Sequence, residues 1–273
     1  MKLTVLAENT SVSGELEREH GLSLYIETSE RRILFDTGAG FVFRNNAEKL
    51  GVDLSKVDRL VISHGHRDHG GGLRTFLAVN SCAEIYLHSQ AFESHYSKRP
   101  EGIVNIGLDQ SLLPNERFLF CKDQVAIDEN MEVFSRVKSK RLFPSCNATL
   151  LMKRGDDFVL DDFAHEQNLI IQENEKTILV AGCAHRGIVN IVDECKDRIG
   201  QYPDFVIGGF HLSGSRGDQS EAREIVNEIG EYLASTPSRY FTCHCTGTEN
   251  FQQLRRILGE RIRYLSTGDQ ISI

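Results

Sequence analysis

The chain has 273 residues, of which 40% are hydrophobic and 26% charged, with 23 glycines and 5 prolines. This composition excludes disordered, collagen-like and coiled-coil proteins, and a chain of this length buries roughly 75% of its unfolded surface, enough for a single α/β domain over residues 1–273. The formal charge of −8 disfavours broad electrostatic binding to nucleic acid or to an anionic membrane, so we expect a small-molecule substrate.

The expected compartment follows from the apolar runs and the cysteines. No apolar run approaches the roughly 18 to 20 residues of a membrane helix, and the first residues lack the apolar core of a secretory signal. Seven cysteines, an odd number, favour reduced thiols over a disulfide framework. We therefore expect a cytoplasmic protein, whose oligomeric state the sequence does not predict.

Apolar runs of strand length alternate with segments of helical period along the whole chain. In the first third, the predicted elements are strands at residues 3–6, 23–28, 32–35 and 59–63, a short helix at 45–50, and a helix from Gly70 through Phe76. The middle contains strand-like pieces, at 85–87, 118–120 and 158–160, whose order the sequence does not assign. The last third predicts a hairpin of residues 169–171 and 177–180, then helices at 188–199, 222–233 and 251–258, the first capped by Gly200.

The strongest local signal is a cluster of three histidines and a carboxylate directly after the strand at 59–63. The segment reads Ser63-His64-Gly65-His66-Arg67-Asp68-His69-Gly70-Gly71-Gly72. Imidazole and carboxylate groups at this density suit Zn(II) or a neighbouring first-row metal, and one segment can supply two adjacent metal positions. The alternative is a polar turn with chance histidines.

Four histidines each follow an apolar run immediately; they are His64, His185, His211 and His244. Ligands of open α/β sheets gather at the carboxyl ends of strands, so this placement predicts one metal centre assembled from distant segments. Any one of them alone could instead be a core histidine with a hydrogen bond.

These residues resemble the five motifs of the metallo-β-lactamase superfamily, in the same order. The motifs are Phe35-Asp36-Thr37-Gly38, then His64-x-His66-x-Asp68-His69, then His185, then Gly208-Gly209-Phe210-His211-Leu212, and last His244. The resemblance covers nearly the whole chain and implies an α/β fold, a four-layer αβ/βα sandwich with metals in a cleft at one edge. A narrower resemblance, in residues 19–23, 63–73, 182–190 and 208–212, is to a branch typified by a methanogen dihydropterin synthase.

The resemblance implies two divalent metal ions, Zn(II) with Mn(II) or Fe(II) as alternatives. The first ion would be held by His64, His66 and His185, and the second by Asp68, His69 and His244. Asp36 would lie beside them and orient a ligand imidazole; the alternative is an ordinary turn residue.

The fourth motif departs from the superfamily pattern, which normally supplies an aspartate that bridges both metals. Here that segment offers only glycine, phenylalanine and His211. A shared carboxylate reduces the repulsion between two close cations. We therefore expect the second site to be weak or partly occupied, or to need a hydroxide or a substrate oxygen as the bridge. His211 itself could ligate a metal, donate a proton to a leaving group, or pack.

Substrate-binding candidates lie around these motifs. Arg186 and Gly187 start the helix after His185, where backbone N–H groups favour an anion such as phosphate. His165 is expected to line the cleft. Polar and charged residues in surface loops are usually solvated and bind nothing. The weaker candidates for substrate binding are therefore Lys98, Arg99, Ser213, Ser215 and Arg216.

The thiols are predicted to be structural. If Cys243 and Cys245 follow strand alternation, they point away from the His244 face and pack. Cys183 shares a face with His185, but a core thiol is the simpler account. His88 and His95 belong to no motif, and no role is predicted for either.

The resemblance implies a metal-dependent hydrolase that acts through a metal-activated water on a small, phosphorylated or ester-type substrate. Asp68 would accept the proton, and His211 would assist the leaving group. One alternative is a transferase that joins a pterinylmethyl diphosphate to a phosphorylated aminobenzene acceptor. A second alternative is a metal-bound sensor without catalytic activity.

Overall fold

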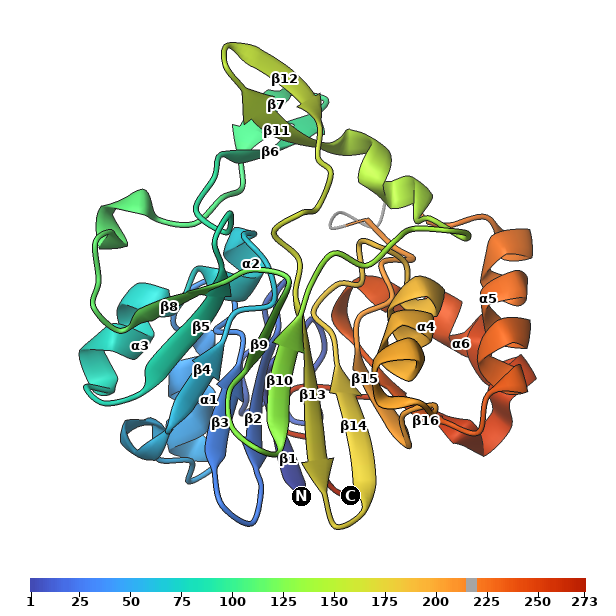
Figure 1. Ribbon diagram of the computed structural model, residues 1–273, viewed down its shortest axis with the longest axis horizontal. Helices are drawn as coiled ribbons and strands as arrows, with labels where there is room; N and C mark the ends of the chain where they lie inside the picture. The colour runs from blue at the N-terminus through green and yellow to red at the C-terminus, as the bar shows by residue number, and fades with distance from the viewer. Residues whose placement is uncertain (215–219) are drawn as a thin grey trace. The chain divides into compact units, whose positions relative to one another are not determined.

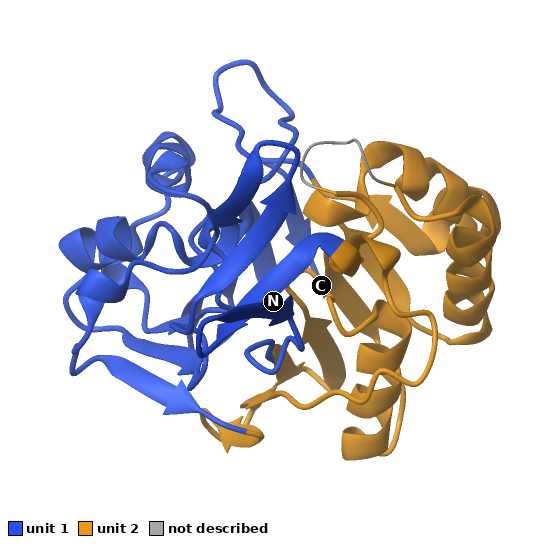
Figure 2. Ribbon diagram, turned by 90° about the horizontal axis from the view of Figure 1, so that it is seen from above, with its two compact units in different colours: residues 1–122, 149–167, 266–273 blue, residues 123–148, 168–265 orange. Residues whose placement is uncertain are grey.

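The computed structural model describes residues 1–214 and 220–273, which divide into two compact units (Figure 1 and Figure 2). Unit 1 comprises Met1–Lys122, Thr149–Gln167 and Ser266–Ile273. Unit 2 comprises Asp123–Ala148 and Asn168–Leu265. Each unit therefore combines segments that lie far apart in the sequence, and the expectation of a single domain stays a prediction.

The main sheet of unit 1 has seven strands in the order β18-β1-β2-β3-β4-β5-β8. Their bounds are β1 Lys2–Ala7, β2 Ser23–Glu27, β3 Arg32–Phe35, β4 Arg59–Val61, β5 Glu84–His88, β8 Phe118–Cys121 and β18 Gln270–Ser272. The pairs from β18 to β3 are antiparallel, whereas β3, β4, β5 and β8 run parallel. Because Phe35 pairs with Val61, the carboxyl ends of β3 and β4 lie side by side.

A separate four-stranded antiparallel sheet belongs to the same unit, in the order β12-β11-β6-β7. Its strands are β6 His95–Arg99, β7 Gly102–Asn105, β11 Leu150–Arg154 and β12 Asp157–Leu160. The sequence did not predict the strand order of this middle region. In the structure, β6 pairs with β11, which lies about fifty residues further along the chain.

The helices of unit 1 are short. They are α1 Val42–Lys49, α2 Arg67–Gly70 and α3 Leu73–Val79, with 3₁₀ turns η1 Leu54–Lys56 and η2 Gln110–Leu112. Phe43 of α1 and Phe76 of α3 pack in one apolar cluster with Leu34, Leu60 and Ile85 of the sheet. The predicted helix at 45–50 begins earlier, and the one predicted from Gly70 to Phe76 is two helices.

The sheet of unit 2 also has seven strands, in the order β17-β16-β15-β14-β13-β10-β9. Their bounds are β9 Gln124–Ala126, β10 Met131–Phe134, β13 Asn168–Glu173, β14 Lys176–Val180, β15 Phe205–Gly208, β16 Arg239–Thr242 and β17 Ile262–Tyr264. The antiparallel pairing of β13 with β14 confirms the predicted hairpin. Strands β14 to β17 are parallel, so their carboxyl ends share one edge of the sheet.

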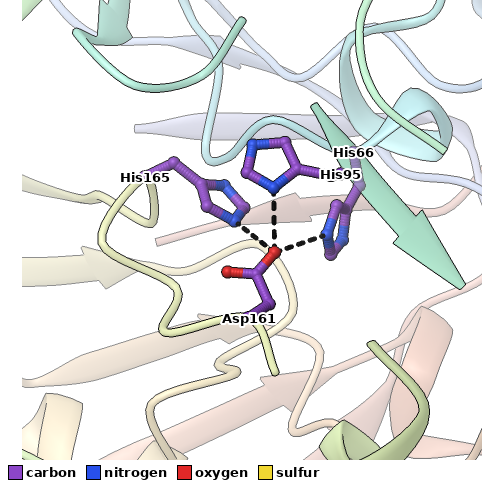
Figure 3. Close-up of side chains that lie close together, drawn as sticks. All are labelled: His66, His95, Asp161 and His165. Carbon is purple, nitrogen blue, oxygen red and sulfur yellow. Dashed lines mark hydrogen bonds and ion pairs between the residues drawn. The ribbon is translucent and has the colours of Figure 1, made fainter. Parts of the chain in front are cut away.

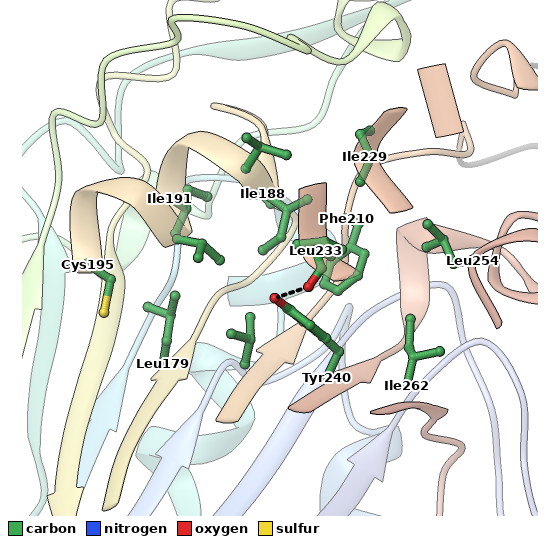
Figure 4. Packing of buried hydrophobic residues seen from close by; sticks show 14 of the residues in the cluster. Leu179, Ile188, Ile191, Cys195, Phe210, Ile229, Leu233, Tyr240, Leu254 and Ile262 are labelled. Atoms are coloured by element: carbon green, nitrogen blue, oxygen red, sulfur yellow. Dashed lines mark hydrogen bonds between the residues drawn. The ribbon is translucent and has the colours of Figure 1, made fainter. Parts of the chain in front are cut away.

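Three amphipathic helices pack against this sheet (Figure 1). They are α4 Ile188–Ile199, α5 Arg223–Ser235 and α6 Thr248–Leu258, and the 3₁₀ turns are η3 Ser145–Thr149, η4 His244–Thr246 and η5 Gly259–Arg261. Figure 4 shows Leu179, Ile188 and Leu233 within one buried cluster, and each such side chain contributes roughly 1.5–3 kcal/mol by leaving water. Gly200 ends α4 in the left-handed conformation, at φ 78°, as predicted. No helix of the described residues has both the length and the apolar character needed to cross a membrane.

Candidate metal centre

The histidine-rich segment lies in the turn between β4 and α2. His64 and His69 are fully buried, and His66 is 4% exposed. The turn packs so closely on the loop after β3 that a Cβ on Gly72 would lie 2.3 Å from the carbonyl oxygen of Thr37. The glycines that follow the histidines are therefore needed to hold the segment against this loop.

Asp36 orients two of these histidines, one of them through Ser63. Its Oδ1 accepts a hydrogen bond from the backbone N–H of Ser63 (2.7 Å), and its Oδ2 accepts from Ser63 Oγ (2.7 Å) and His69 Nδ1 (2.7 Å). Because the Ser63 hydroxyl donates to Asp36, its oxygen accepts from Nδ1 of His64 (2.8 Å). Both rings then carry their proton on Nδ1, and Nε2 is the atom with which each would ligate a metal.

A second buried carboxylate lies beside His66 (Figure 3). Oδ2 of Asp161 accepts from Nδ1 of His95 (2.8 Å) and Nε2 of His165 (3.3 Å), and it lies 4.0 Å from Nε2 of His66. The backbone N–H of Gly65 donates to Nδ1 of His165 (2.9 Å). A backbone amide can only donate, so the proton of the His165 ring is on Nε2, facing Asp161.

The charges of this cluster follow from its burial. Burial lowers the pKa of His165 and lowers that of His66 well below its ordinary value, so both rings are neutral near pH 7. Burial alone would raise the pKa of the Asp161 carboxyl, but hydrogen bonds from His165 and His95 hold it below its usual range. Asp161 is thus a buried anion beside the neutral rings of His66 and His165.

Asp68 is the most accessible of the predicted ligands in unit 1, with its side chain 25% exposed. Its Oδ2 lies 3.3 Å from Nε2 of His20 and 3.9 Å from Nε2 of His69. Asn9 Nδ2 lies 3.2 Å from Nδ1 of His20, which turns the other ring nitrogen toward Asp68. The carboxylate is therefore positioned and still reachable by solvent.

In unit 2, His185 follows β14, and a side chain holds its Nδ1 as in His64 and His69 of unit 1. Its Nδ1 donates to Oδ1 of Asn147 (3.0 Å), whose Nδ2 donates to the carbonyl oxygen of His185 (2.8 Å). Nε2 is again the atom that would ligate. The ring of His185 lies 4.1 Å from that of His211, measured between centroids.

Four non-glycine residues at the predicted motifs have the left-handed backbone conformation. They are Asp36 (φ 60°), Ala184 (φ 58°), His211 (φ 51°) and His244 (φ 50°). Such residues cost about 1–3 kcal/mol each and concentrate at functional sites. Each lies just beyond the carboxyl end of a sheet strand, β3, β14, β15 or β16.

The thiols near these strand ends depart from the expected pattern. Strand alternation does not reach Cys245, because β16 ends at Thr242 and η4 begins at His244. Cys245 instead accepts a hydrogen bond from the backbone N–H of His211 (3.3 Å). Burial raises the pKa of the Cys245 thiol, yet interactions with Cys183, His211 and His244 bring it well below its ordinary value.

The substrate-binding residues that the sequence predicted have structural contacts. Nε of Arg186 donates to the carbonyl oxygen of Val137 (2.8 Å), and Gly187 precedes α4 at φ 87°. Both ring nitrogens of His165 are hydrogen-bonded within unit 1. Their roles toward a substrate stay predictions, and Ser215 and Arg216 lie outside the described residues.

Sequence reasoning missed Asp161, His95 and Asn147. None of them belongs to a motif. The contacts of Asp161 with His66 and His95, and of Asn147 with His185, form through folding of distant segments. The one signal available was the position of Asp161 four residues before His165.

The donor set fits a divalent metal. His64, His69 and His185 each have Nδ1 held by a side chain, which is how ligand imidazoles are oriented in metal proteins. Carboxylates and imidazoles together suit Zn(II) and neighbouring first-row metals.

Comparisons with known proteins identify similar sequences and structures. The family model of the metallo-β-lactamase superfamily matches residues 16–199. The uncharacterized protein MJ0448 of Methanocaldococcus jannaschii is 28% identical over 262 residues, 93% of this chain and 94% of that protein. In the same organism, 7,8-dihydropterin-6-methyl-4-(beta-D-ribofuranosyl)-aminobenzene-5'-phosphate synthase is 26% identical over 265 residues, 90% of this chain and 88% of the synthase.

Among solved structures, Tm1679, described as a metal-dependent hydrolase of the beta-lactamase superfamily, superposes with a TM-score of 0.85 at 28% identity. The match covers 100% of this chain and 99% of that one. The predicted α/β fold of the metallo-β-lactamase type is thereby confirmed.

Proposed function

Because this chain belongs to the metallo-β-lactamase superfamily, we propose that it is a metal-dependent hydrolase of a small, phosphorylated or ester-type substrate. The observation that carries the proposal is the shared hydrogen bonding of three predicted ligands. His64, His69 and His185 all have Nδ1 engaged by a side chain, so that Nε2 is the ligating nitrogen.

Two divalent ions, Zn(II) foremost and Mn(II) or Fe(II) as alternatives, would be held as the family resemblance implies. His64, His66 and His185 would bind the first, and Asp68, His69 and His244 the second. When bound, such ions polarise the scissile group and lower the pKa of water from 15.7 to about 7.

The chain's own groups would supply proton transfer and orientation. Asp68 is the accessible carboxylate and would accept the proton of the attacking water, with His20 holding it in place at 3.3 Å. Asp36 would keep both His64 and His69 in the ligating tautomer, directly or through Ser63. Asp161, 4.0 Å from Nε2 of His66, would orient that ring.

The net charge, the free thiols and the similar solved structure support a small-molecule substrate, a cytoplasmic location and a hydrolase. A net charge of −8 supports a small molecule over nucleic acid or membrane. All seven cysteines are free thiols, which supports a reducing, cytoplasmic location. The hydrolase described for the similar solved structure supports the reaction class.

A transferase is the second candidate, because the named curated relative is a synthase 26% identical over most of both chains. In that reaction the ions would act on a diphosphate leaving group, and an aromatic acceptor would displace it.

The test uses chelator-treated protein reloaded with Zn(II), Mn(II) or Fe(II) and assayed on p-nitrophenyl esters of phosphoric and carboxylic acids. We expect turnover only with metal and none in His64→Ala, while His88→Gln, outside every predicted ligand set, keeps it. Equal turnover in metal-free protein would refute the proposal. Diphosphate release that requires an aminobenzene acceptor would favour the transferase.

A further inference from the structure

Three strand ends of unit 2 bring two thiols and an imidazole together. Cys183 follows β14, His211 follows β15 and Cys245 follows β16. One donor atom from each, the two sulfurs and a ring nitrogen, lie within 4.8 Å of one another. The residues are 3%, 7% and 4% exposed, so the group is shielded from water.

His211 is the unexplained member of this group. Within the described part of the chain, neither of its ring nitrogens has a hydrogen-bond partner, although the ring is buried. A buried polar group left in this state costs about 1–3 kcal/mol, and in native proteins it usually has a water or an ion as its partner. The backbone of His211 is also held at φ 51°, a strained conformation for a non-glycine residue.

The sulfur of Cys245 is held in place by its neighbours. The backbone N–H of His211 donates to it (3.3 Å), and its own S–H donates to the carbonyl oxygen of Cys183 (3.5 Å). A Cβ on Gly209 would lie 2.5 Å from this sulfur, so only glycine leaves room for it there. These contacts fix the sulfur within 4.8 Å of a ring nitrogen of His211.

We propose that Cys183, His211 and Cys245 form a soft metal site that takes Zn(II). Two sulfurs and one imidazole are donors that select zinc, and three protein ligands leave a fourth position for water or substrate. Binding releases the two thiol protons to solvent, and the two thiolates neutralise the charge of the divalent ion.

The proposed site accounts for the departure of the fourth motif, residues 208–212, from the superfamily pattern. That segment lacks the bridging aspartate of the superfamily, and it provides His211 together with the glycine that seats Cys245. Negative charge next to the His185 and His244 segments would then come from thiolates rather than from a shared carboxylate. The set lies entirely within unit 2, and none of its members is among the six ligands proposed for the hydrolase ions. The sulfur of Cys183 nevertheless lies within 4.8 Å of a ring nitrogen of His185 and of one of His244.

Cobalt(II) tests the proposal, because thiolate ligands give it a charge-transfer absorption in the near ultraviolet that nitrogen and oxygen ligands do not. Metal-free protein, kept reduced and free of oxygen, is titrated with Co(II). We expect this absorption in the natural protein and its loss in the double variant Cys183→Ala/Cys245→Ala. The matched control Cys195→Ala, a core thiol of the same unit, should keep it.

Three results would overturn the site. One is a cobalt spectrum of the natural protein without thiolate charge transfer at saturation, which needs no variant to fold. Another is an absorption that His211→Gln leaves unchanged in both intensity and cobalt affinity. A third is loss of the absorption in Cys195→Ala as well. His64→Ala separates the two proposals, because it should abolish hydrolysis and leave the thiolate absorption intact.

Discussion

Replacing Asp161 by asparagine tests whether this carboxylate organises the region around His66. The carboxylate is fully buried and also accepts the backbone N–H of Phe163 (2.7 Å), in addition to its bonds with His95 and His165. An asparagine that keeps its oxygen toward the two rings must turn its NH₂ group against the Phe163 N–H.

The magnitude follows from these contacts. The Phe163 N–H, left without an acceptor, costs about 1–3 kcal/mol. The hydrogen bonds from His95 and His165 each lose about 1 kcal/mol when their acceptor becomes neutral. Removing a buried charge offsets part of this loss, because burial is the largest influence on that carboxyl. We expect Asp161→Asn to lower the free energy of unfolding of the metal-free protein by about 2–3 kcal/mol. Zinc affinity should fall about 10- to 100-fold through His66.

Urea unfolding of the metal-free protein and zinc competition with a chromophoric chelator, both at pH 7, measure the two effects. The neighbouring Asp162→Asn is the matched control. Asp162 is 44% exposed and pairs with Arg154 (2.6 Å), and such a surface pair contributes about 0–1 kcal/mol. If Asp161→Asn behaves like this control in both assays, the carboxylate does not organise the region.

Three further changes give separate outcomes. Asp36→Asn should leave metal bound but about 10- to 100-fold more weakly, as chelator competition would show, since an amide cannot accept all the bonds of that carboxylate; unchanged affinity would contradict the role. The metal-free protein should lose stability as pH falls below about 6.5. The pKa values of His66 and His165 in the folded protein lie below that of histidine in the unfolded chain, so the unfolded chain binds protons first and is favoured. Urea unfolding between pH 8 and 5 measures this slope, and His165→Gln should flatten it. Gly209→Ala should displace the sulfur of Cys245 and abolish the cobalt–thiolate absorption, and an unaltered spectrum would argue against that position of the sulfur.

The parts of the fold that could be predicted are those with local causes. The β13–β14 hairpin and the end of α4 at Gly200 depend on neighbouring residues, and both are as predicted. The pairing of β6 with β11 joins segments far apart in the chain, and no local periodicity specifies such a partner. The helix expected from Gly70 to Phe76 is divided because Gly71 ends α2 and Gly72 precedes α3.

The same distinction separates the parts of the candidate site. The density of histidines in residues 64–69 could be read directly, and so could the possible role of Asp36. Asn147 and Asp161 could not, because an asparagine or aspartate outside a motif shows nothing of the imidazole that it will meet after folding. Cys245 was expected to follow a strand, but the chain turns at His244, and that turn brings the sulfur next to His211.

Strained backbone occurs at the strand ends that carry the predicted ligands, although positive φ is also found at Asn174 and Glu175 in the β13–β14 turn. Asp36 in unit 1 and Ala184, His211 and His244 in unit 2 all adopt positive φ just after sheet strands. A packed core gains nothing from such conformations, which cost about 1–3 kcal/mol each, and glycine at these positions would remove most of that cost. The side chains of Asp36, His211 and His244 must therefore be needed where the strain places them. Ala184 has no functional group, so its strain is explained by the orientation that it gives to the next residue, His185.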